Sequence, residues 1–107
     1  MMTPQEMESV IRSTVLRYID PAETMVFLFG SRADGTHQPA SDYDVGLYSG
    51  QEIPWAILGH IREDLEESDV PVTVDVVDFS TVAPDFKSLA LKKITIWNQP
   101  QKNLKLI

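Results

Sequence analysis

The sequence predicts a small α/β domain in which helices pack on one mixed β-sheet. Its 107 residues suit a single domain. Hydrophobic residues make up 43% of the chain and charged residues 23%, which is close to the average of globular proteins and argues against a disordered or fibrous chain. Helical patterns and short apolar runs alternate in the order α-β-β-α-β-α, followed by a short last strand. We expect the domain to span residues 1–98, with a tail over 99–107.

The first half of the chain predicts one helix and two strands. The motif TPQE is typical of a capping box with proline at the first helical position, and apolar residues recur behind it at helical spacing, so a helix is expected over 3–19. The run TMVFLF is too short for a helix and predicts a buried strand over 24–29. A polar, turn-forming stretch follows over 31–40, with room for one helical turn. The segment DYDVGLY predicts a second strand over 42–48.

The second half predicts two helices and two strands. An amphipathic pattern indicates a helix over 54–67. The run VPVTVDVVDF predicts a third strand over 70–79, in which proline is tolerated only at the beginning. A last helix is expected over 84–93, and 94–97 adds a short edge strand. The apolar faces of these two helices include Trp55, Phe86 and Leu89.

The charge of the chain restricts its partners. Nine basic residues stand against 16 acidic ones, which gives a net charge of −7. Such a charge repels polyanions, and phosphate contacts supply most of the affinity for nucleic acids, so no direct nucleic-acid binding is expected. The chain has no cysteine, which excludes disulfides, thiolate zinc sites and cysteine nucleophiles. No apolar run is long enough to span a bilayer and no signal-peptide pattern occurs, so we expect no membrane segment and a cytoplasmic protein.

One stretch, FLFGSRADGTHQPASDYDVGLY, carries residues suited to phosphate chemistry. Gly30 lets the backbone turn tightly and approach a ligand without a Cβ in the way. Ser31 offers a hydroxyl and a backbone N–H to a phosphate oxygen. Asp42 and Asp44 are two positions apart in a strand, so both carboxylates are expected on one face.

A third carboxylate lies in the next apolar strand. Asp75 interrupts the run VTVDVVDF, and a charge in such a strand is costly to bury unless it is paired or bound to a metal. If the third strand lies beside the second, Asp75 joins the two earlier carboxylates in one cluster. Carboxylates held close repel each other unless a cation lies between them, and oxygen ligands suit Mg²⁺. Two divalent ions would orient a triphosphate for in-line attack by a hydroxyl, for which Asp75 is the candidate base.

With Gly30-Ser31, a ten-residue gap, Asp42-x-Asp44 and Asp75 on a later strand, the chain resembles the DNA polymerase β-like nucleotidyltransferase superfamily. It is most similar to the smallest members, the minimal nucleotidyltransferases (MNT). The resemblance covers nearly the whole chain and implies a fold like the palm domain of polymerase β. It also implies that Asp42, Asp44 and Asp75 are the catalytic carboxylates and ligate two Mg²⁺ ions, which Mn²⁺ can replace.

The same resemblance implies how substrate and partner are bound. Gly30 and Ser31 would hold the nucleotide phosphates, Arg32 is the nearby cation for a triphosphate, and Ser41 stands where family members often carry serine before the first aspartate. Minimal members act beside a small helical HEPN protein, often as the antitoxin of a toxin–antitoxin pair, and transfer AMP to a tyrosine of that protein. We therefore expect an NTP, taken as ATP, as substrate. The expected acceptor is a HEPN-type protein, docked partly through residues 102–107.

Other interpretations stay open at this point. The chain could be a non-catalytic module that blocks its partner by binding, although three mutually repelling carboxylates favour an enzyme. A homodimer is a competing way to cover the site, and the negative charge opposes a polymerase or a tRNA-end enzyme.

Asp78 is expected to be a cap or a surface residue rather than a member of the cluster, because it points to the opposite face from Asp75. His37 and the acidic run over 63–69 are expected to be solvated.

Overall fold

The computed structural model describes residues 1–101, 103 and 104 and contains one four-stranded sheet flanked by helices. In chain order the elements are α1 (Pro4–Leu16), β1 (Met25–Phe29), α2 (Ser31–Asp34), β2 (Tyr43–Tyr48), α3 (Trp55–Glu66), β3 (Val74–Asp78), α4 (Pro84–Ala90) and β4 (Thr95–Asn98). This order confirms the predicted α/β class, including the single helical turn after β1 and the last edge strand.

The sheet is mixed, with the strand order β3-β2-β1-β4. β1 runs antiparallel to both of its neighbours, β2 and β4, whereas β2 and β3 are parallel. Parallel neighbours require a crossover connection, and α3 supplies it between β2 and β3. All five residues of β1 are buried, which explains its continuous apolar run where a half-exposed strand would alternate.

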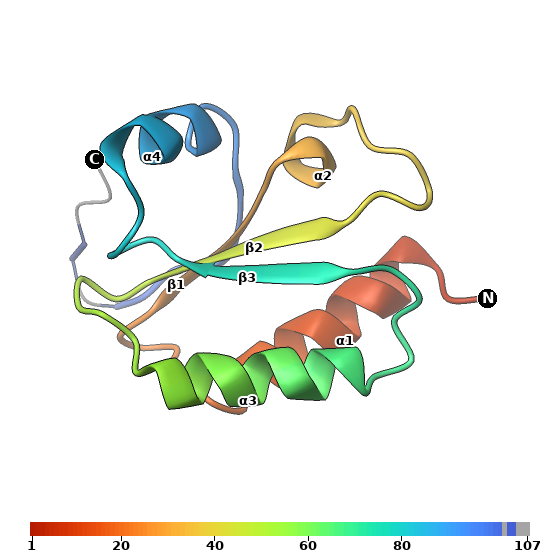
Figure 1. The fold of residues 1–107 in the computed structure, drawn as a ribbon, viewed down its shortest axis with the longest axis horizontal. Helices are drawn as coiled ribbons and strands as arrows, with labels where there is room; N and C mark the ends of the chain where they lie inside the picture. Colours follow the sequence, from red (N-terminus) through yellow and green to blue (C-terminus); the bar gives the residue numbers. More distant parts are fainter. Residues whose placement is uncertain (102, 105–107) are drawn as a thin grey trace.

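Helices cover both faces of the sheet. α1 and α3 lie along one face, and α2 and α4 lie on the other (Figure 1). The main core fills the space between the sheet and α1 with α3, and its fully buried members include Ile11, Val15, Tyr43, Val45 and Ile61. A second, aromatic cluster lies on the opposite face and contains Met25, Phe27, Phe29 and Phe79.

The N-terminal helix begins as predicted and ends earlier. The Thr3 hydroxyl accepts a hydrogen bond from the Glu6 N–H at 3.1 Å, and the Glu6 carboxylate accepts one from the Thr3 N–H at 2.9 Å, so the capping box is present. α1 ends at Leu16 rather than at residue 19. The N–H groups of Arg17 and Tyr18 bond to carbonyls three residues back, which tightens and closes the last turn.

β3 and α4 are also shorter than predicted. β3 begins at Val74 rather than at residue 70, because its neighbour β2 begins at Tyr43, which pairs with Val74. Pro71, which has no N–H to donate, therefore lies outside the strand. α4 ends at Ala90 rather than at residue 93, since the chain turns there to enter β4 at Thr95.

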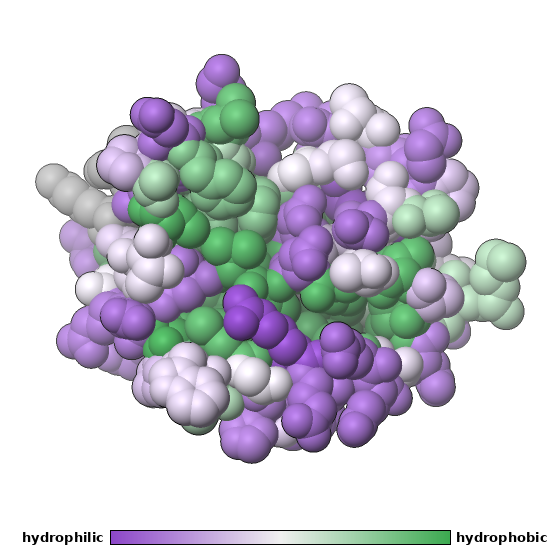
Figure 2. Space-filling model, viewed as in Figure 1, coloured by the Kyte–Doolittle hydropathy of each residue, from purple (hydrophilic) through white to green (hydrophobic). Residues whose placement is uncertain are grey.

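Three apolar side chains of the predicted helices are exposed. Trp55 has 85% of its surface accessible, Leu89 67% and Phe86 43%. Trp55 is the first residue of α3, and the seven-residue α4 buries none of its side chains completely. Hydrophobic side chains accordingly gather on the outer surface over α4 (Figure 2).

The segment after β4 packs on the domain where the structure describes it. Pro100 is buried, and the Gln101 N–H donates to the carbonyl of Ala22 at 3.1 Å. Leu104 contacts the aromatic cluster. Residues 102 and 105–107 of the predicted docking segment lie outside the described residues. Over the part of the chain that is described, no helix is long and apolar enough to cross a membrane.

Candidate functional site

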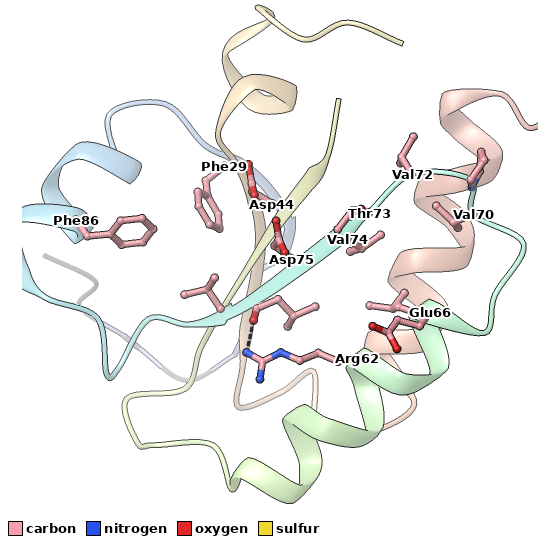
Figure 3. A pocket seen from close by; sticks show the side chains of 14 residues that line it. Phe29, Asp44, Arg62, Glu66, Val70, Val72, Thr73, Val74, Asp75 and Phe86 are labelled. Carbon is pink, nitrogen blue, oxygen red and sulfur yellow. Dashed lines mark hydrogen bonds between the residues drawn. The ribbon is translucent and has the colours of Figure 1, made fainter. Parts of the chain in front are cut away.

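The sheet register brings two of the predicted site carboxylates together. Asp44 in β2 pairs with Asp75 in β3 and, on its other side, with Phe29 in β1. Neighbouring strands lie about 4.8 Å apart, and directly paired residues point to the same face. The side chains of Asp44 and Asp75 therefore emerge side by side, on the face away from α1 and α3 (Figure 3).

Gly30, directly after β1, leaves room for the Asp44 side chain. Its backbone has φ +72° and ψ −157°, a conformation open to glycine and strained for other residues. A Cβ at this position would lie 2.3 Å from Asp44 Oδ2 and 3.2 Å from its Cγ. Glycine is thus required by the close approach of the end of β1 to this carboxylate. Ser31 follows as the first residue of α2 and is half-buried.

The electrostatics of Asp44 reflect this crowding. Burial and the nearby negative charges of Asp75 and Asp42 raise the pKa of the Asp44 carboxyl above its usual range. Asp42 lies one residue before β2 and is exposed, so it interacts with Asp44 from the entrance of the strand. All three causes disfavour the charged carboxylate, and a cation placed among these groups would reverse the effect.

The donor set at this place fits a hard divalent cation. Among the described residues no three acidic or histidine side chains already form a group that could hold a metal ion by themselves. Mg²⁺, however, is usually bound by one or two carboxylates together with substrate phosphates and water, and does not need a closed protein cage. The adjacent Asp44 and Asp75 supply that number of carboxylates, with Asp42 in electrostatic contact with Asp44.

Arg32 and Ser41 hold the loop between α2 and β2. The Arg32 guanidinium donates to the carbonyl oxygen of Pro39 at 3.1 Å and to that of Ser41 at 2.9 and 3.3 Å. It also lies 4.3 Å from the centroid of the Tyr43 ring. The Ser41 hydroxyl accepts a hydrogen bond from the Gln38 N–H at 2.8 Å. Both predicted nucleotide-binding residues are thus engaged in fixing the loop that leads into β2.

The contacts of Arg32 lie on the other side of the sheet from the paired carboxylates. Tyr43 is fully buried, and its hydroxyl donates to the Glu8 carboxylate of α1 at 3.1 Å. Burial and the Glu8 charge raise the pKa of Tyr43 to about 12, so the hydroxyl keeps its proton. Tyr43 and Asp44 are consecutive in β2 and therefore point to opposite faces. The sequence puts Arg32 next to Ser31, but the structure directs its guanidinium toward Tyr43.

A cavity of about 830 Å³ opens beside Asp44 and Asp75. On one side of the carboxylates it is lined by Phe29 and Phe86, and on the other it follows β3 and α3 (Figure 3). Arg62 of α3 borders it and donates to the carbonyl of Val76 at 2.6 Å. The sequence places Phe86 on the last predicted helix, and no sequence signal indicated that its ring borders the carboxylates.

Asp78 is neither a helix cap nor a surface residue, contrary to expectation, because it is buried and bonds to the segment before α3 and to the turn after β3. Its carboxylate is buried and accepts hydrogen bonds from the Ile53 N–H at 2.7 Å and from the N–H and hydroxyl of Ser80 at 3.0 and 2.7 Å. These bonds tie the start of α3 to the end of β3. His37 is exposed in the loop, as expected.

One member of the acidic run is not simply solvated. Asp64 accepts a hydrogen bond from the Tyr18 hydroxyl and forms an ion pair with Arg17 at 3.1 Å. These contacts join α3 to the end of α1, which the sequence pattern did not indicate.

The sequence of the chain matches known proteins over most of its length. Residues 18–102 match the family described as Polymerase beta, Nucleotidyltransferase. A relative from Haemophilus influenzae, named a probable protein adenylyltransferase MntA, is 30% identical over 97 residues, which cover 91% of this chain and 84% of that protein.

Solved structures share the fold at lower identity. A toxin–antitoxin complex with AMP-PNP is similar with a TM-score of 0.66 and 21% identity, over 85% of this chain and 73% of that one. A complex of the tri-AMPylated HEPN toxin of Shewanella oneidensis with its MNT antitoxin gives a TM-score of 0.68 and 17% identity, over 91% and 74% of the two chains. The family match over residues 18–102, together with the paired carboxylates beside Gly30, shows that this chain belongs to the polymerase β nucleotidyltransferase family.

Proposed function

We propose that this protein is a Mg²⁺-dependent nucleotidyltransferase that transfers AMP from ATP to a hydroxyl group. The observation that carries the proposal is the pairing of Asp44 with Asp75 on adjacent strands, directly beside Gly30. Two carboxylates so close, with a raised pKa on one of them, are unfavourable in a purely structural role and suited to a cation bound with a triphosphate. The family match and the adenylyltransferase name of the H. influenzae relative support the same chemistry.

In this proposal Asp42, Asp44 and Asp75 hold two divalent ions. When bound, Mg²⁺ or Mn²⁺ would offset the charge of the triphosphate and favour attack by a hydroxyl oxygen. Gly30 lets the end of β1 lie against the Asp44 carboxylate, because no Cβ stands between them. Ser31 supplies a hydroxyl donor from the first residue of α2.

The transfer exchanges a phosphoanhydride bond of ATP for a phosphoester bond to the acceptor. The acceptor oxygen bonds to the α-phosphorus, the bond from that phosphorus to the bridging oxygen breaks, and pyrophosphate leaves. Asp75 takes the proton of the acceptor hydroxyl. It suits this role because it is exposed to the cavity at the edge strand β3, whereas Asp44 lies between two strands.

We further propose that the acceptor is a HEPN-type helical protein and that this chain acts as its antitoxin in the cytoplasm. The similar S. oneidensis complex contains a tri-AMPylated HEPN toxin, and the H. influenzae relative is named for protein adenylylation. A protein hydroxyl also suits a chain of net charge −7 better than a nucleic-acid end does, because no excess of basic residues is present to attract a polyanion.

Co-expression with a HEPN-type protein encoded beside it, followed by intact-mass measurement of both chains with ATP and Mg²⁺, tests this function. We expect the partner to gain the mass of one or more AMP units. Asp44→Asn and Asp75→Asn should remove the gain without unfolding the domain. Glu63→Gln is the matched control, because Glu63 is an exposed carboxylate of α3 away from the site.

The same experiment separates the two interpretations of the sequence. A stable complex without any mass gain, in the presence of bound ATP, would contradict the transferase and favour a module that blocks its partner by binding. Wild-type modification levels in Asp44→Asn would show that the carboxylate pair does not perform the reaction.

A further inference from the structure

Phe86 is an aromatic side chain left half open at the edge of the candidate site. Its ring makes edge-to-face contact with Phe29, with centroids 6.0 Å apart at 90°, and lies 5.9 Å from the ring of Phe79. Phe29 and Phe79 are buried, with 6% and 1% of their surface exposed, whereas Phe86 keeps 43%. Phe86 is thus the outermost ring of the aromatic cluster: one side packs on Phe29 and Phe79, and the other is accessible from the cavity.

The open ring and the carboxylates belong to one cavity. Phe86, Phe29, Asp44 and Asp75 line the same space of about 830 Å³, which is within the range of small-molecule sites. Phe29 pairs directly with Asp44 on the neighbouring strand, and the Phe86 ring packs against the Phe29 ring. Figure 3 shows both rings on one side of the two carboxylates. A nucleotide with its phosphates at the carboxylates can therefore extend toward these rings.

We propose that Phe86, supported by Phe29, is the surface on which the base of the nucleotide stacks. The inference rests on the proposed function, because it takes the carboxylates to mark the position of the phosphates. Base–aromatic stacking is strong and tolerates different bases, since every base has a π-face. Phenylalanine has no hydrogen-bonding group, so Phe86 contributes affinity for the nucleoside and does not distinguish adenine from guanine.

The position of Leu89 provides a control on the same helix. Leu89 is even more exposed, at 67%, and does not line the cavity. A protein partner seated on the outer surface of α4 would be affected by the loss of either side chain. A nucleotide in the cavity should be affected by the loss of Phe86 only.

Binding measured by calorimetry with Mg²⁺ and two probes tests the inference. The probes are the non-hydrolysable nucleotide AMP-PNP and inorganic tripolyphosphate, which has no base. Phe86→Ala should raise the Kd of AMP-PNP by about five- to hundredfold, as expected from the loss of one stacking contact, and leave the Kd of tripolyphosphate unchanged. Phe86→Tyr and Phe86→Trp should bind AMP-PNP like the wild type, and Leu89→Ala should change neither Kd.

The outcomes separate this inference from the proposed function. If the wild type binds AMP-PNP and Phe86→Ala binds it equally well, the base does not stack on Phe86, while the transferase proposal stands. Equal weakening of both probes in Phe86→Ala would also overturn the inference, because the effect would then not involve the base. If the wild type binds neither probe, the proposed function fails together with the inference.

Discussion

Replacing Gly30 by alanine tests whether the end of β1 has to approach the Asp44 carboxylate. At φ +72° and ψ −157°, alanine costs about 1–3 kcal/mol of backbone strain. The new Cβ would also lie 2.3 Å from Asp44 Oδ2, well inside van der Waals contact. The short Asp44 side chain can relieve this contact only by turning its carboxylate away. We therefore expect Gly30→Ala to lower the free energy of unfolding by more than this strain of about 1–3 kcal/mol, and to abolish nucleotidyl transfer.

Urea unfolding and the mass assay on matched variants measure the two effects separately. Gly35→Ala is the control, because Gly35 also has a positive φ of +84° and a Cβ there would meet no atom within 4 Å. It should cost about 1–2 kcal/mol of strain and keep its activity. A double-mutant cycle with Asp44→Ala isolates the clash, because only the Cβ of residue 44, at 3.4 Å, then remains near the new methyl group. In that background the cost of Gly30→Ala should fall to the strain alone.

Two results would refute this reasoning. An active Gly30→Ala variant as stable as Gly35→Ala would show that the backbone does not need to approach the carboxylate. An identical cost of Gly30→Ala in the wild-type and Asp44→Ala backgrounds would show that the new methyl group does not meet the carboxylate at all.

The remaining predictions concern charge and the loop. The pKa of the Asp44 carboxyl is raised in the folded state, so the folded protein binds a proton at Asp44 more tightly than the unfolded chain does. Protonated Asp44 therefore stabilises the fold at low pH, and this stabilisation is lost as the pH rises through the folded pKa. Asp44→Asn should therefore be more stable than the wild type at neutral pH. Mg²⁺ should raise the Tm of the wild type and not that of Asp44→Asn, and a wild-type Tm that does not change with Mg²⁺ would contradict a metal site. Arg32→Ala should lower the free energy of unfolding by about 1.5–3 kcal/mol, because it removes charged hydrogen bonds to the carbonyls of Pro39 and Ser41, and Arg32→Lys should not restore it. If Arg32→Ala instead leaves the free energy of unfolding unchanged and weakens ATP binding ten- to hundredfold, which is roughly the loss of one charged contact to phosphate, then Arg32 binds phosphate.

Most of the secondary structure could be predicted because its signals are local. The capping box of Thr3 and Glu6 involves residues three apart, and it is present as expected. The buried run of β1 and the helical turn after Gly30 also depend on neighbouring residues. The errors lie at element ends, where a distant contact decides. β3 starts at Val74 because its partner strand starts opposite that residue, which no local pattern records.

The family resemblance predicted the residues of the site but not all of their surroundings. Gly30, Asp42 and Asp44 were predicted as site residues from their spacing, since they lie within 15 positions of one another along the chain. The placement of Arg32 could not, because its contacts depend on how the loop closes over Tyr43. The sequence placed Phe86 only on the last predicted helix, and its half-exposed ring follows from the packing of α4 at the end of the aromatic cluster.

The sequence by itself determined the α/β class and the order of the elements, and it predicted the glycine and aspartates of the site, because residue type and short spacing encode these features. Only the tertiary structure decided that Asp75 stands beside Asp44, that Arg32 turns toward Tyr43 and that Phe86 borders the carboxylates. Each of these depends on strand register or on packing between elements far apart in the chain. Such contacts arise when the sheet assembles, and local propensity carries no information about them.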